Sequence, residues 1–537
     1  MQREVEKIKN NTFDILIIGG GIHGGALARE ASLNGYKVCL IEKDDFGSQT
    51  SANSLKVLHG GLRYLQHANF KRMRESIFSR KVFQQIAPHL VTSVPYVIPT
   101  SGYTIKSKLA LSIAMKLNDL ISFDRNSEIK NECFIPPGKI ISKQEIEKII
   151  PDIDTEGISG GAVWYESVAL NTERLLFEFL HEAFENGATL ANYVKAVSYS
   201  LEKEKISAVN VIDELTGEKF QVKSKIIVNS VGPWLNEILS GTDDLKYLEA
   251  PLTKAVSIII KKNLFGKYAV GLESVKEFTD KAAVINKGKR LFFFVPLGEF
   301  TMIGTTYKVC KETPDNCQIN KQDIQEIIDE VNGVYKTLNL RYEDVTHVHM
   351  GTQAMPNVEF ENEFDVQAET HSLVFDHSKN GNLQNLISIK SVKYTTAPSI
   401  AKNILRILNK KNMIFENYDK LSYDDVSNNY DSVKKDFFIK NKNYNNYFLE
   451  RLWNTYGIRS QNVVNYVERN DESKKTIIHE EEIYYGELKY NIDEEMAISF
   501  EDILARRLGL TALEEVPKSY SAKIKNIINE CIKNNND

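Results

Sequence analysis

The order of apolar and polar runs predicts alternating strands and a helix near the start of the chain. The run FDILII at 13–18 is short and apolar, and the alanine-rich segment GGALAREASLNG that follows it is typical of a helix. A second apolar run, KVCLIE at 37–42, comes directly after that segment. This order predicts a compact β–α–β unit, and KIIVNSVGPW at 225–234 predicts another buried strand that ends at glycine and proline.

Two other regions have a different pattern. KRLFFFVPLGEFTMI at 289–303 contains two β-rich runs joined by PLGEF, which predicts a hairpin in an antiparallel sheet. KSKLALSIAMKLNDLIS at 106–122 predicts an amphipathic helix, which either packs on the protein's own core or lies on a membrane surface. Its apolar positions at helical spacing are Leu109, Ile113, Leu117, Leu120 and Ile121, and the lysines around them are Lys106, Lys108 and Lys116.

Composition and charge narrow the class of protein. The chain has 537 residues, 42% hydrophobic and 26% charged, so we expect two or three globular domains. The formal net charge of −5 creates no overall basic field for nucleic acid. The opening MQREVEKIKNNTFD is charged where a signal peptide is apolar, and no run of about 18 apolar residues occurs, so we expect a cytoplasmic protein.

The five cysteines are scattered along the chain. Only Cys310 and Cys317 lie close together in the sequence, and they lack CxxC spacing. This pattern favours a reducing compartment and no zinc site.

GGGIHGG at 19–25 supplies a G-x-G-x-x-G motif through Gly19, Gly21 and Gly24. The motif follows a predicted strand, opens a predicted helix, and is followed about 20 residues later by Glu42 at the end of the next strand, which is the context of a dinucleotide site. The glycines allow a tight turn, a close approach to a pyrophosphate and close helix–strand packing, and the helix N-terminus attracts the phosphates. We expect Glu42 to accept hydrogen bonds from a ribose, and His23 to be a surface residue of the loop.

The surroundings of this motif favour FAD over NAD. In FAD enzymes of the glutathione-reductase type the motif usually lies near the N-terminus, and the rest of the chain folds back around the flavin. The hydroxyls of Thr50 and Ser51, beside Ser48, suit the neighbourhood of an FAD pyrophosphate, and Gly232 ends a late strand that suits the same architecture.

We therefore expect an α/β fold of three parts: an FAD-binding, Rossmann-like domain of the glutathione-reductase type, an inserted antiparallel β substrate domain, and a helical C-terminal domain. The FAD-binding domain is expected to be discontinuous. The predicted boundaries are 1–100, 150–240 and 375–410 for the FAD-binding domain, 241–374 with an excursion at 101–149 for the substrate domain, and 411–537 for the helical domain.

The segment from FDILIIGGG to VLHGGLRYLQ resembles the N-terminus of FAD-dependent glycerol-3-phosphate dehydrogenases, and the likeness extends over nearly the whole chain. It is carried by a combination of short motifs, because no single one of them is specific. These are APHL at 87–90, VALNTERLL at 168–176, VNSVGPW at 228–234, IGTT at 303–306, YTTA at 394–397, YG at 456–457 and FEDILARR at 500–507.

The resemblance implies roles for particular residues. Gly60 and Gly61 would lie against the isoalloxazine, with His59, Tyr394 and Thr395 also contacting the cofactor. Arg63 and Lys393 would bind anionic oxygens and stabilise charge in the reaction, and Lys393 would also lie beside the flavin. Arg and Lys suit this role because they stay charged and bind phosphate oxygens. The implied substrate contacts are Arg63, Tyr64, Lys393, Thr395 and Arg290.

The sequence departs from the family pattern at the substrate site. Ser257 stands where a histidine is expected, and Gln353 where a phosphate-binding arginine is expected. His371 falls near the position of a second arginine, and Tyr307 replaces an acidic residue. Either His371 or Tyr307 is therefore our candidate base, and Lys254 or His371 our candidate compensating cation.

The expected function is the FAD-dependent oxidation of a secondary alcohol, by resemblance sn-glycerol 3-phosphate to dihydroxyacetone phosphate. By family analogy the electrons pass to a quinone, and oxygen stays open as the acceptor. Two alternatives stay open: a related dehydrogenase or oxidase acting on another polyol phosphate, a hydroxy acid or an amine, and a flavin-binding protein without catalysis. The resemblance also implies peripheral contact with the inner face of the cell membrane. The oligomeric state stays open, with a homodimer as one outcome, and we expect neither a metal nor a nucleic-acid partner.

Overall fold

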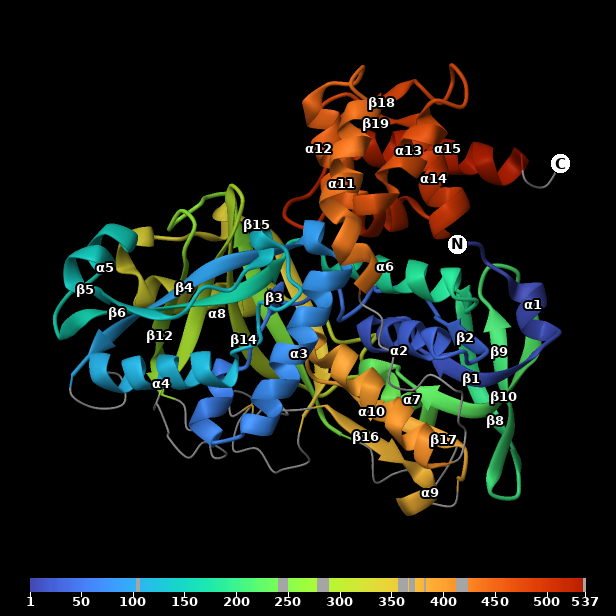
Figure 1. Ribbon diagram of the computed structural model, residues 1–537, viewed down its shortest axis with the longest axis horizontal. Helices are drawn as coiled ribbons and strands as arrows, with labels where there is room; N and C mark the ends of the chain where they lie inside the picture. The colour runs from blue at the N-terminus through green and yellow to red at the C-terminus, as the bar shows by residue number, and fades with distance from the viewer. Residues whose placement is uncertain are drawn as a thin grey trace.

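The computed structural model has two large sheets side by side and a helical region above them (Figure 1). It describes residues 1–102, 107–239, 250–277, 289–355, 366, 372–380, 383–411 and 424–534. Within these ranges the side chains of residues 63, 66, 67, 131, 277, 290, 380, 424–428 and 531–534 lie outside the description. The α/β architecture with an antiparallel second sheet and a helical C-terminal region confirms the predicted fold class.

The first sheet is built around the predicted β–α–β unit. The apolar run after Asn11 forms β1 (Thr12–Ile18), which pairs in parallel with β2 (Val38–Ile41) on one side and β10 (Lys219–Asn229) on the other. β1, β2 and the buried end of β10 at 226–228 are nearly continuous apolar runs because both faces of a parallel sheet are covered. The strands follow the order β16 (Leu373–Asp376), β17 (Leu386–Lys390), β10, β1, β2 and β7 (Thr189–Ala191), and β9 (Lys205–Asp213) joins β10 to β8 (Val194–Glu202).

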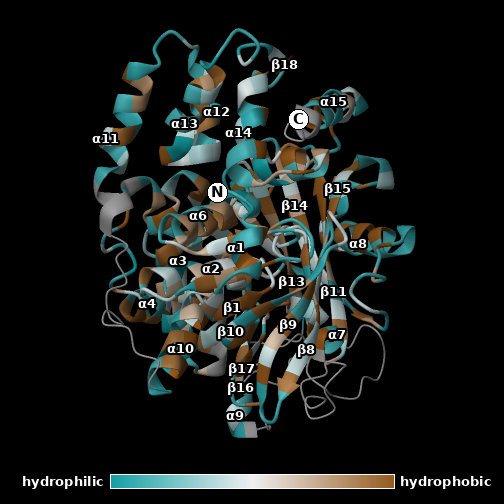
Figure 2. Cartoon of the chain, turned by 90° about the vertical axis from the view of Figure 1, so that its right-hand side faces the viewer, coloured by the Kyte–Doolittle hydropathy of each residue, from teal (hydrophilic) through white to brown (hydrophobic). Residues whose placement is uncertain are grey.

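Helices cover one face of this sheet, and an antiparallel layer covers the other. Side chains of β1 such as Ile15 and Ile17 pack against the helices, whereas Leu16 and Ile18 pack against β8, β9 and the short helix α1 (Val5–Lys9). In Figure 2 the hydrophobic residues lie mainly on packed helices and strands, and the loops at the top are mainly hydrophilic. The covering helices are α2 (Ile22–Leu33), α3 (Phe70–Ile86), α6 (Thr172–Glu185) and α10 (Ala397–Lys410).

The second sheet is largely antiparallel and carries α8 (Lys321–Val334) on one face. Its β13 (Lys289–Leu297) and β14 (Phe300–Cys310) form a hairpin, which confirms the prediction for residues 289–303. The strand order is β15 (Val345–Ala354), β11 (Leu252–Ile260), β14, β13, β12 (Ala269–Glu277), β4 (Val91–Ser101), β6 (Ile158–Ala169) and β3 (Val57–Leu58), and β5 (Lys139–Ser142) pairs with β6.

The strands β4 and β6 require a correction to the predicted domain ranges. We assigned residues 1–100 and 150–240 to the FAD-binding domain, but β4 and β6 pair with each other and with the second sheet. The reason is that a strand's apolar pattern reports burial and not which sheet supplies its partner. The other domain boundaries stay predictions.

The C-terminal region is helical and has cores of its own. It lies at the top of Figure 1, above the first sheet. Its helices are α11 (Asp424–Lys440), α12 (Asn446–Tyr456), α13 (Ser460–Val467), α14 (Tyr485–Glu495) and α15 (Lys518–Asn534), with a π-helical turn η10 (Asp502–Arg507) and a small hairpin of β18 (Thr476–Ile478) and β19 (Ile483–Tyr484).

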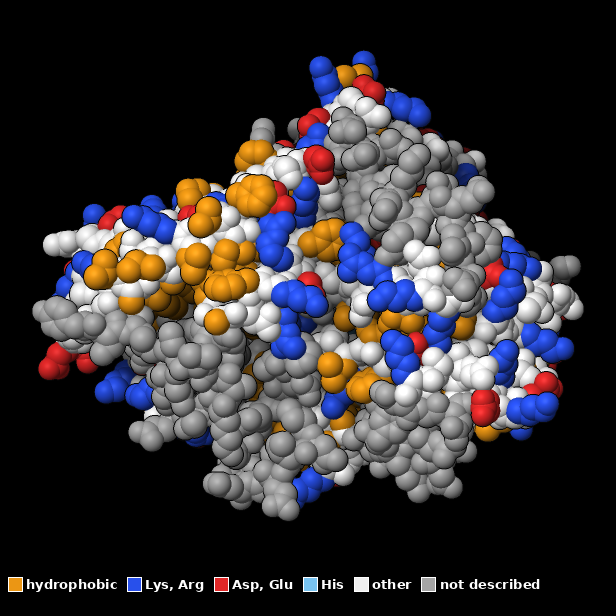
Figure 3. Space-filling model, turned by 60° about the horizontal axis from the view of Figure 1, so that its bottom comes forward, with side chains coloured by type: hydrophobic (Ala, Val, Ile, Leu, Met, Phe, Trp, Pro, Cys, Tyr) orange, Lys and Arg blue, Asp and Glu red, His pale blue; other side chains and the backbone are white. Residues whose placement is uncertain are grey.

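The predicted amphipathic helix is present as α4 (Lys108–Ile121), and most of its apolar face is exposed. Leu109 is 73% exposed, Leu120 is 71% exposed, and the neighbouring Phe123 is 81% exposed. Figure 3 shows hydrophobic side chains gathered on the face that carries α4, with Lys and Arg side chains beside them. No helix among the described residues is long and apolar enough to cross a membrane.

The cysteines show one feature that the sequence reading did not predict. Cys310 and Cys317 are paired as a disulfide, because the end of β14 and the loop after it bring the two residues together. Cys39 and Cys133 are buried thiols.

Candidate active site

The glycine motif forms the turn between β1 and α2. Gly19 has φ +105°, and a Cβ there would lie 2.5 Å from the backbone oxygen of Ser230 at the end of β10. A Cβ on Gly24 would collide with the backbone of Gly19, so Gly24 allows α2 to pack closely against β1. These are the roles that the motif predicts, and the N-terminus of α2 opens beside the turn.

Glu42, at the end of β2, holds the turn from the other side. Its carboxylate accepts the backbone N–H of Gly20 at 2.6 Å and that of Asp44 at 3.0 Å. Burial raises the pKa of Glu42. The side chain also lines the cavity described next, in which we expect a ribose.

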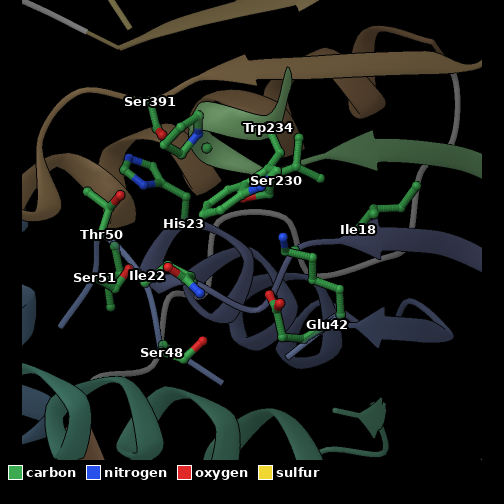
Figure 4. A pocket seen from close by; sticks show the side chains of 18 of the residues that line it. Ile18, Ile22, His23, Glu42, Ser48, Thr50, Ser51, Ser230, Trp234 and Ser391 are labelled. Carbon is green, nitrogen blue, oxygen red and sulfur yellow. Dashed lines mark hydrogen bonds between the residues drawn. The ribbon is translucent and has the colours of Figure 1, made fainter. Parts of the chain in front are cut away.

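A cavity of about 280 Å³ lies over the glycine turn, between the two sheets (Figure 4). It is lined by the carboxyl ends of β1, β2 and β10, by the loop at 47–51, by β8, and by the ends of β15 and β17. The predicted cofactor residues that line it are Gly19, Gly21, Glu42, Thr50, Ser51, Gly232, Lys393 and Tyr394.

Three buried polar atoms at this cavity have no hydrogen-bond partner among the described residues: His23 Nε2, Ser48 Oγ and Ser230 Oγ. The expectation that His23 is a surface residue was wrong, because the first turn of α2 directs its imidazole inward, towards the side of the cavity that carries Thr50 and Ser391 (Figure 4). Burial lowers the pKa of His23 to about 4, so the imidazole is neutral at pH 7.

Trp234 is a second lining residue that sequence reasoning missed. Its ring lines the cavity, its Nε1–H donates to Asp315 at 3.0 Å, and the ammonium of Lys43 lies 4.1 Å from the ring centroid. Its place in VNSVGPW, directly after Gly232 and Pro233 at the end of a buried strand, was the signal that could have found it.

Lys393 and Tyr64 meet at the edge of the cavity. The Lys393 ammonium donates to the Tyr64 hydroxyl at 2.7 Å and lies 4.4 Å from the centroid of its ring. Lys393 comes from the turn after β17, and the buried Tyr64 from the short helix η1 (Leu62–His67). The fold thus brings together two residues that we predicted for the substrate site.

The comparisons with known proteins assign the family. Residues 14–404 match the family described as FAD dependent oxidoreductase, and residues 417–533 match the C-terminal domain of alpha-glycerophosphate oxidase. The chain belongs to the FAD-dependent oxidoreductase family.

Two relatives of this FAD-dependent oxidoreductase are named as glycerol-3-phosphate dehydrogenases. A glycerol-3-phosphate dehydrogenase of Synechocystis is 30% identical over 414 residues, covering 75% of this chain and 71% of its own. An aerobic glycerol-3-phosphate dehydrogenase of Staphylococcus aureus is 28% identical over 521 residues, covering 94% of this chain and 88% of its own.

Solved structures support the fold. The glycerol-3-phosphate dehydrogenase of Bacillus halodurans, complexed with FAD, superposes with a TM-score of 0.73 at 20% identity and covers 99% of this chain and 93% of its own. The L-alpha-glycerophosphate oxidase of Mycoplasma pneumoniae, also with FAD bound, gives a TM-score of 0.51 at 17% identity and covers 74% of this chain and 95% of its own.

The cofactor of this oxidoreductase is FAD, and the residues present fit it. The turn and the N-terminus of α2 suit the pyrophosphate, and Glu42 suits a ribose. The unpartnered atoms of His23, Ser48 and Ser230 need a polar ligand because buried polar groups are normally hydrogen-bonded.

The glycine pair of the oxidoreductase packs against α3. A Cβ on Gly60 would collide with the guanidinium of Arg80, and Gly61, with φ +86°, would meet Ser76 at 3.1 Å. The Gly60 N–H donates to the buried Glu166 at 2.5 Å. The close approach that the two glycines allow is therefore to the protein's own helix, and their contact with the flavin stays a prediction.

Two other predicted cofactor residues, Tyr394 and Thr395, form hydrogen bonds near the glycine pair. The Thr395 hydroxyl accepts the backbone N–H of His59 at 3.2 Å, and the Tyr394 hydroxyl donates to the backbone oxygen of Thr172 at 2.7 Å. Tyr394 lines the cavity. His59, Gly60, Gly61 and Thr395 are not among its described lining residues.

The divergent positions lie on one face of the second sheet. Ala255 on β11 lies directly opposite Tyr307 on β14 and Gly351 on β15. Directly opposite residues share a face of the sheet. A Cβ on Gly351 would lie 2.9 Å from the Asn53 backbone oxygen and 3.3 Å from the Thr50 side chain, so this face is turned towards residues 50–53. Ser257 and Gln353 lie on the same face, because side chains two residues apart along a strand point to the same side. Gln353 lines the cavity, whereas Tyr307 is not among its described lining residues.

Three predicted site residues are described in part or not at all. The backbone of Arg63 lies in η1 and that of Arg290 in β13, but their side chains are outside the description. His371 lies outside the described residues.

Proposed function

We propose that the protein oxidises the secondary alcohol of sn-glycerol 3-phosphate to dihydroxyacetone phosphate and passes the electrons to a quinone. The proposal is supported by the names of the relatives and by the C-terminal match. The observation that carries it is the hydrogen bond of Lys393 to Tyr64 at the edge of the cavity. It supports the proposal because the Lys393 ammonium is held at the edge of the cavity in which we expect the flavin.

The chain's own residues supply binding and charge. Lys393 binds an anionic oxygen of the substrate, and Arg63 supplies the second cation. Tyr64 orients the Lys393 ammonium through its hydroxyl. Bound FAD supplies a two-electron acceptor for the hydride of the substrate carbon. The hydroxyl proton passes to Tyr307 or His371, our two candidate bases.

A second candidate function is favoured by the divergent positions. Ser257 and Gln353 share the sheet face that carries Gly351, and Gln353 lines the cavity. The family resemblance leads us to expect a histidine and an arginine at these two positions. Each charge-assisted hydrogen bond lost there weakens binding by about 1.5–3 kcal/mol. A substrate with less negative charge, such as a hydroxy acid or an amine, fits such a site. Another polyol phosphate stays an open alternative. A flavin-binding protein without catalysis is the third candidate.

Anaerobic reduction of the bound flavin tests these candidates. The purified holoprotein is mixed with sn-glycerol 3-phosphate, other polyol phosphates, 2-hydroxy acids and amines, and the flavin absorbance is followed. Bleaching fastest with sn-glycerol 3-phosphate supports the first proposal. Bleaching only with another class overturns it in favour of the second, and no bleaching by any substrate, with normal reduction by dithionite, favours the third.

We also propose that α4 attaches the protein to the inner face of the cell membrane, in a cytoplasmic protein. Its exposed leucines and isoleucine form an apolar face, and Lys108 and Lys116 lie on the same helix. An amphipathic helix of this composition binds an anionic surface through buried apolar area and electrostatic attraction.

Homodimer formation stays a prediction.

A further inference from the structure

Asp45 is a buried carboxylate held by the C-terminal helical region. It lies three residues after Glu42 and is 1% exposed. Arg507 donates from Nη2 to Asp45 Oδ1 at 2.9 Å and from Nη1 to Oδ2, and Arg506 donates from Nε to the same Oδ2. Asn192 Nδ2 donates to Oδ1 at 3.0 Å. Two cations from one turn of η10 therefore hold a single carboxylate of the FAD-binding domain.

The two arginines are themselves fixed within the C-terminal region. Arg507 donates from Nη2 to the backbone oxygen of Glu495, at the end of α14, at 2.6 Å. Arg506 donates from Nη2 to the buried Asp502 at 2.6 Å, and Asp502 accepts the Tyr193 hydroxyl at 2.9 Å. The contact joins elements that are 461 and 462 residues apart in sequence.

The residues directly after Asp45 contact the cofactor turn. A Cβ on Gly20 would lie 2.5 Å from the ring of Phe46, which is fully buried. The Gly47 N–H donates to the Gly20 oxygen at 3.1 Å, and the Ser48 N–H donates to the Asp45 oxygen at 3.2 Å. Residues 47–51 then line the cavity, and the Ser51 hydroxyl accepts the Ile22 N–H at the start of α2 at 3.0 Å.

We propose that the C-terminal helical region positions the FAD-binding loop, with Arg507 and Arg506 holding Asp45 so that residues 46–51 close against the glycine turn. Asp45, Arg506 and Arg507 are positioning residues in this account and do not contact FAD. Breaking a buried, paired charge leaves its partner uncompensated, so the loop has to rearrange when either side is removed. The inference depends on FAD as the cofactor and is independent of which substrate the enzyme oxidises.

The proposal also implies the reverse effect. If the C-terminal region strengthens FAD binding through the loop, FAD binding stabilises the C-terminal contact by the same factor, because coupling between two binding events is reciprocal. Amide hydrogen exchange in residues 498–511 should therefore slow when FAD is added to the apoprotein. A purely structural ion pair gives no such response.

The test measures the affinity of the apoprotein for FAD by fluorescence titration. Asp45→Asn and Arg507→Lys should each raise the dissociation constant for FAD at least tenfold. Arg459→Lys is the matched control, since Arg459 is a buried arginine of the C-terminal region whose Nη1 donates to Glu178 on α6 at 2.5 Å, away from the loop. The dissociation constant of Arg459→Lys for FAD should stay within twofold of the wild-type value, even if its melting temperature falls as much as that of Asp45→Asn or Arg507→Lys.

Hydrogen exchange completes the test. FAD should slow exchange at 498–511 in the wild type and in Arg459→Lys, and this protection should be lost in Arg507→Lys. The proposal is overturned if folded Asp45→Asn and Arg507→Lys bind FAD as tightly as the wild type, or if Arg459→Lys loses the same affinity. If Asp45→Asn does not fold, Arg507→Lys, which keeps the charge and loses the fork of donors, decides the question alone.

Discussion

The ammonium of Lys393 and the hydroxyl of Tyr64 lie 2.7 Å apart although 329 residues separate them in sequence. The turn after β17 supplies the lysine and η1 supplies the tyrosine. Their contact at the edge of the cofactor cavity places charge where the substrate's anionic oxygens are proposed to bind. The chemistry of this enzyme is therefore most directly tested at this pair.

Lys393→Ala should slow anaerobic flavin reduction by about 10- to 100-fold, because a charge-assisted hydrogen bond contributes about 1.5–3 kcal/mol. FAD should remain bound, as judged by the flavin absorbance after gel filtration. Tyr64→Phe is the companion variant, which keeps the ring and removes the hydroxyl, and it should cause a smaller loss. Unchanged reduction in Lys393→Ala means that the lysine has no role in the reaction.

Gln353→Arg should restore a phosphate-binding cation in the cavity and lower the KM for sn-glycerol 3-phosphate by about tenfold or more. Gln353 lines the cavity and is half-buried, so an arginine side chain can reach the cavity from the end of β15. Gln353→Met, similar in volume and without charge, is the control. An Arg variant with the same KM as the Met variant would show that this position does not face the substrate.

His23→Leu should weaken FAD binding about tenfold, because His23 Nε2 is buried at the cavity without a partner among the described residues and FAD supplies the polar atoms. Fluorescence titration of the apoprotein measures the change. His479→Leu, at an exposed histidine of the C-terminal region, should leave the affinity unchanged. Equal affinity in His23→Leu and the wild type counts against contact with the cofactor.

The stability of the apoprotein should fall as the pH drops from 6.5 towards 4. Burial lowers the pKa of His89 to about 3, below the ordinary value of about 6.5. The unfolded chain therefore takes up a proton in this window that the folded chain does not, so the free energy of unfolding rises with pH. His89→Gln should reduce this slope by about 1.4 kcal/mol per pH unit, measured by urea denaturation, and exposed His479→Gln should not.

Replacing the exposed apolar residues of α4 should reduce binding to anionic vesicles. Leu109→Asp combined with Leu120→Asp removes apolar area and adds negative charge, and both side chains are more than two-thirds exposed, so the fold should be retained. Leu201→Asp, at a half-exposed leucine of β8, is the control. Binding of the wild type should also weaken with added salt, and equal co-sedimentation of all variants would argue against this surface.

Much of the first sheet and its turn was predictable because the signals are local. FDILII and KVCLIE are apolar runs, and the glycines between them have the spacing of a dinucleotide-binding turn. The sheet membership of β4 and β6 and the inward direction of His23 were not predictable, because each depends on which distant element packs opposite.

By itself, the sequence determined the β–α–β unit, the choice of FAD, the hairpin at 289–303 and the helical character of the C-terminal region. The unit, the hairpin and the helical character follow from residue types and spacings within a few turns of chain, whereas the choice of FAD also used the place of the motif near the N-terminus and the late strand that ends at Gly232. Only the tertiary structure decided that Lys393 meets Tyr64, that Gly60 and Gly61 pack against α3, and that Arg507 holds Asp45. These contacts join residues far apart in the chain, and long-range pairing depends on the packing of whole elements, which no local pattern encodes.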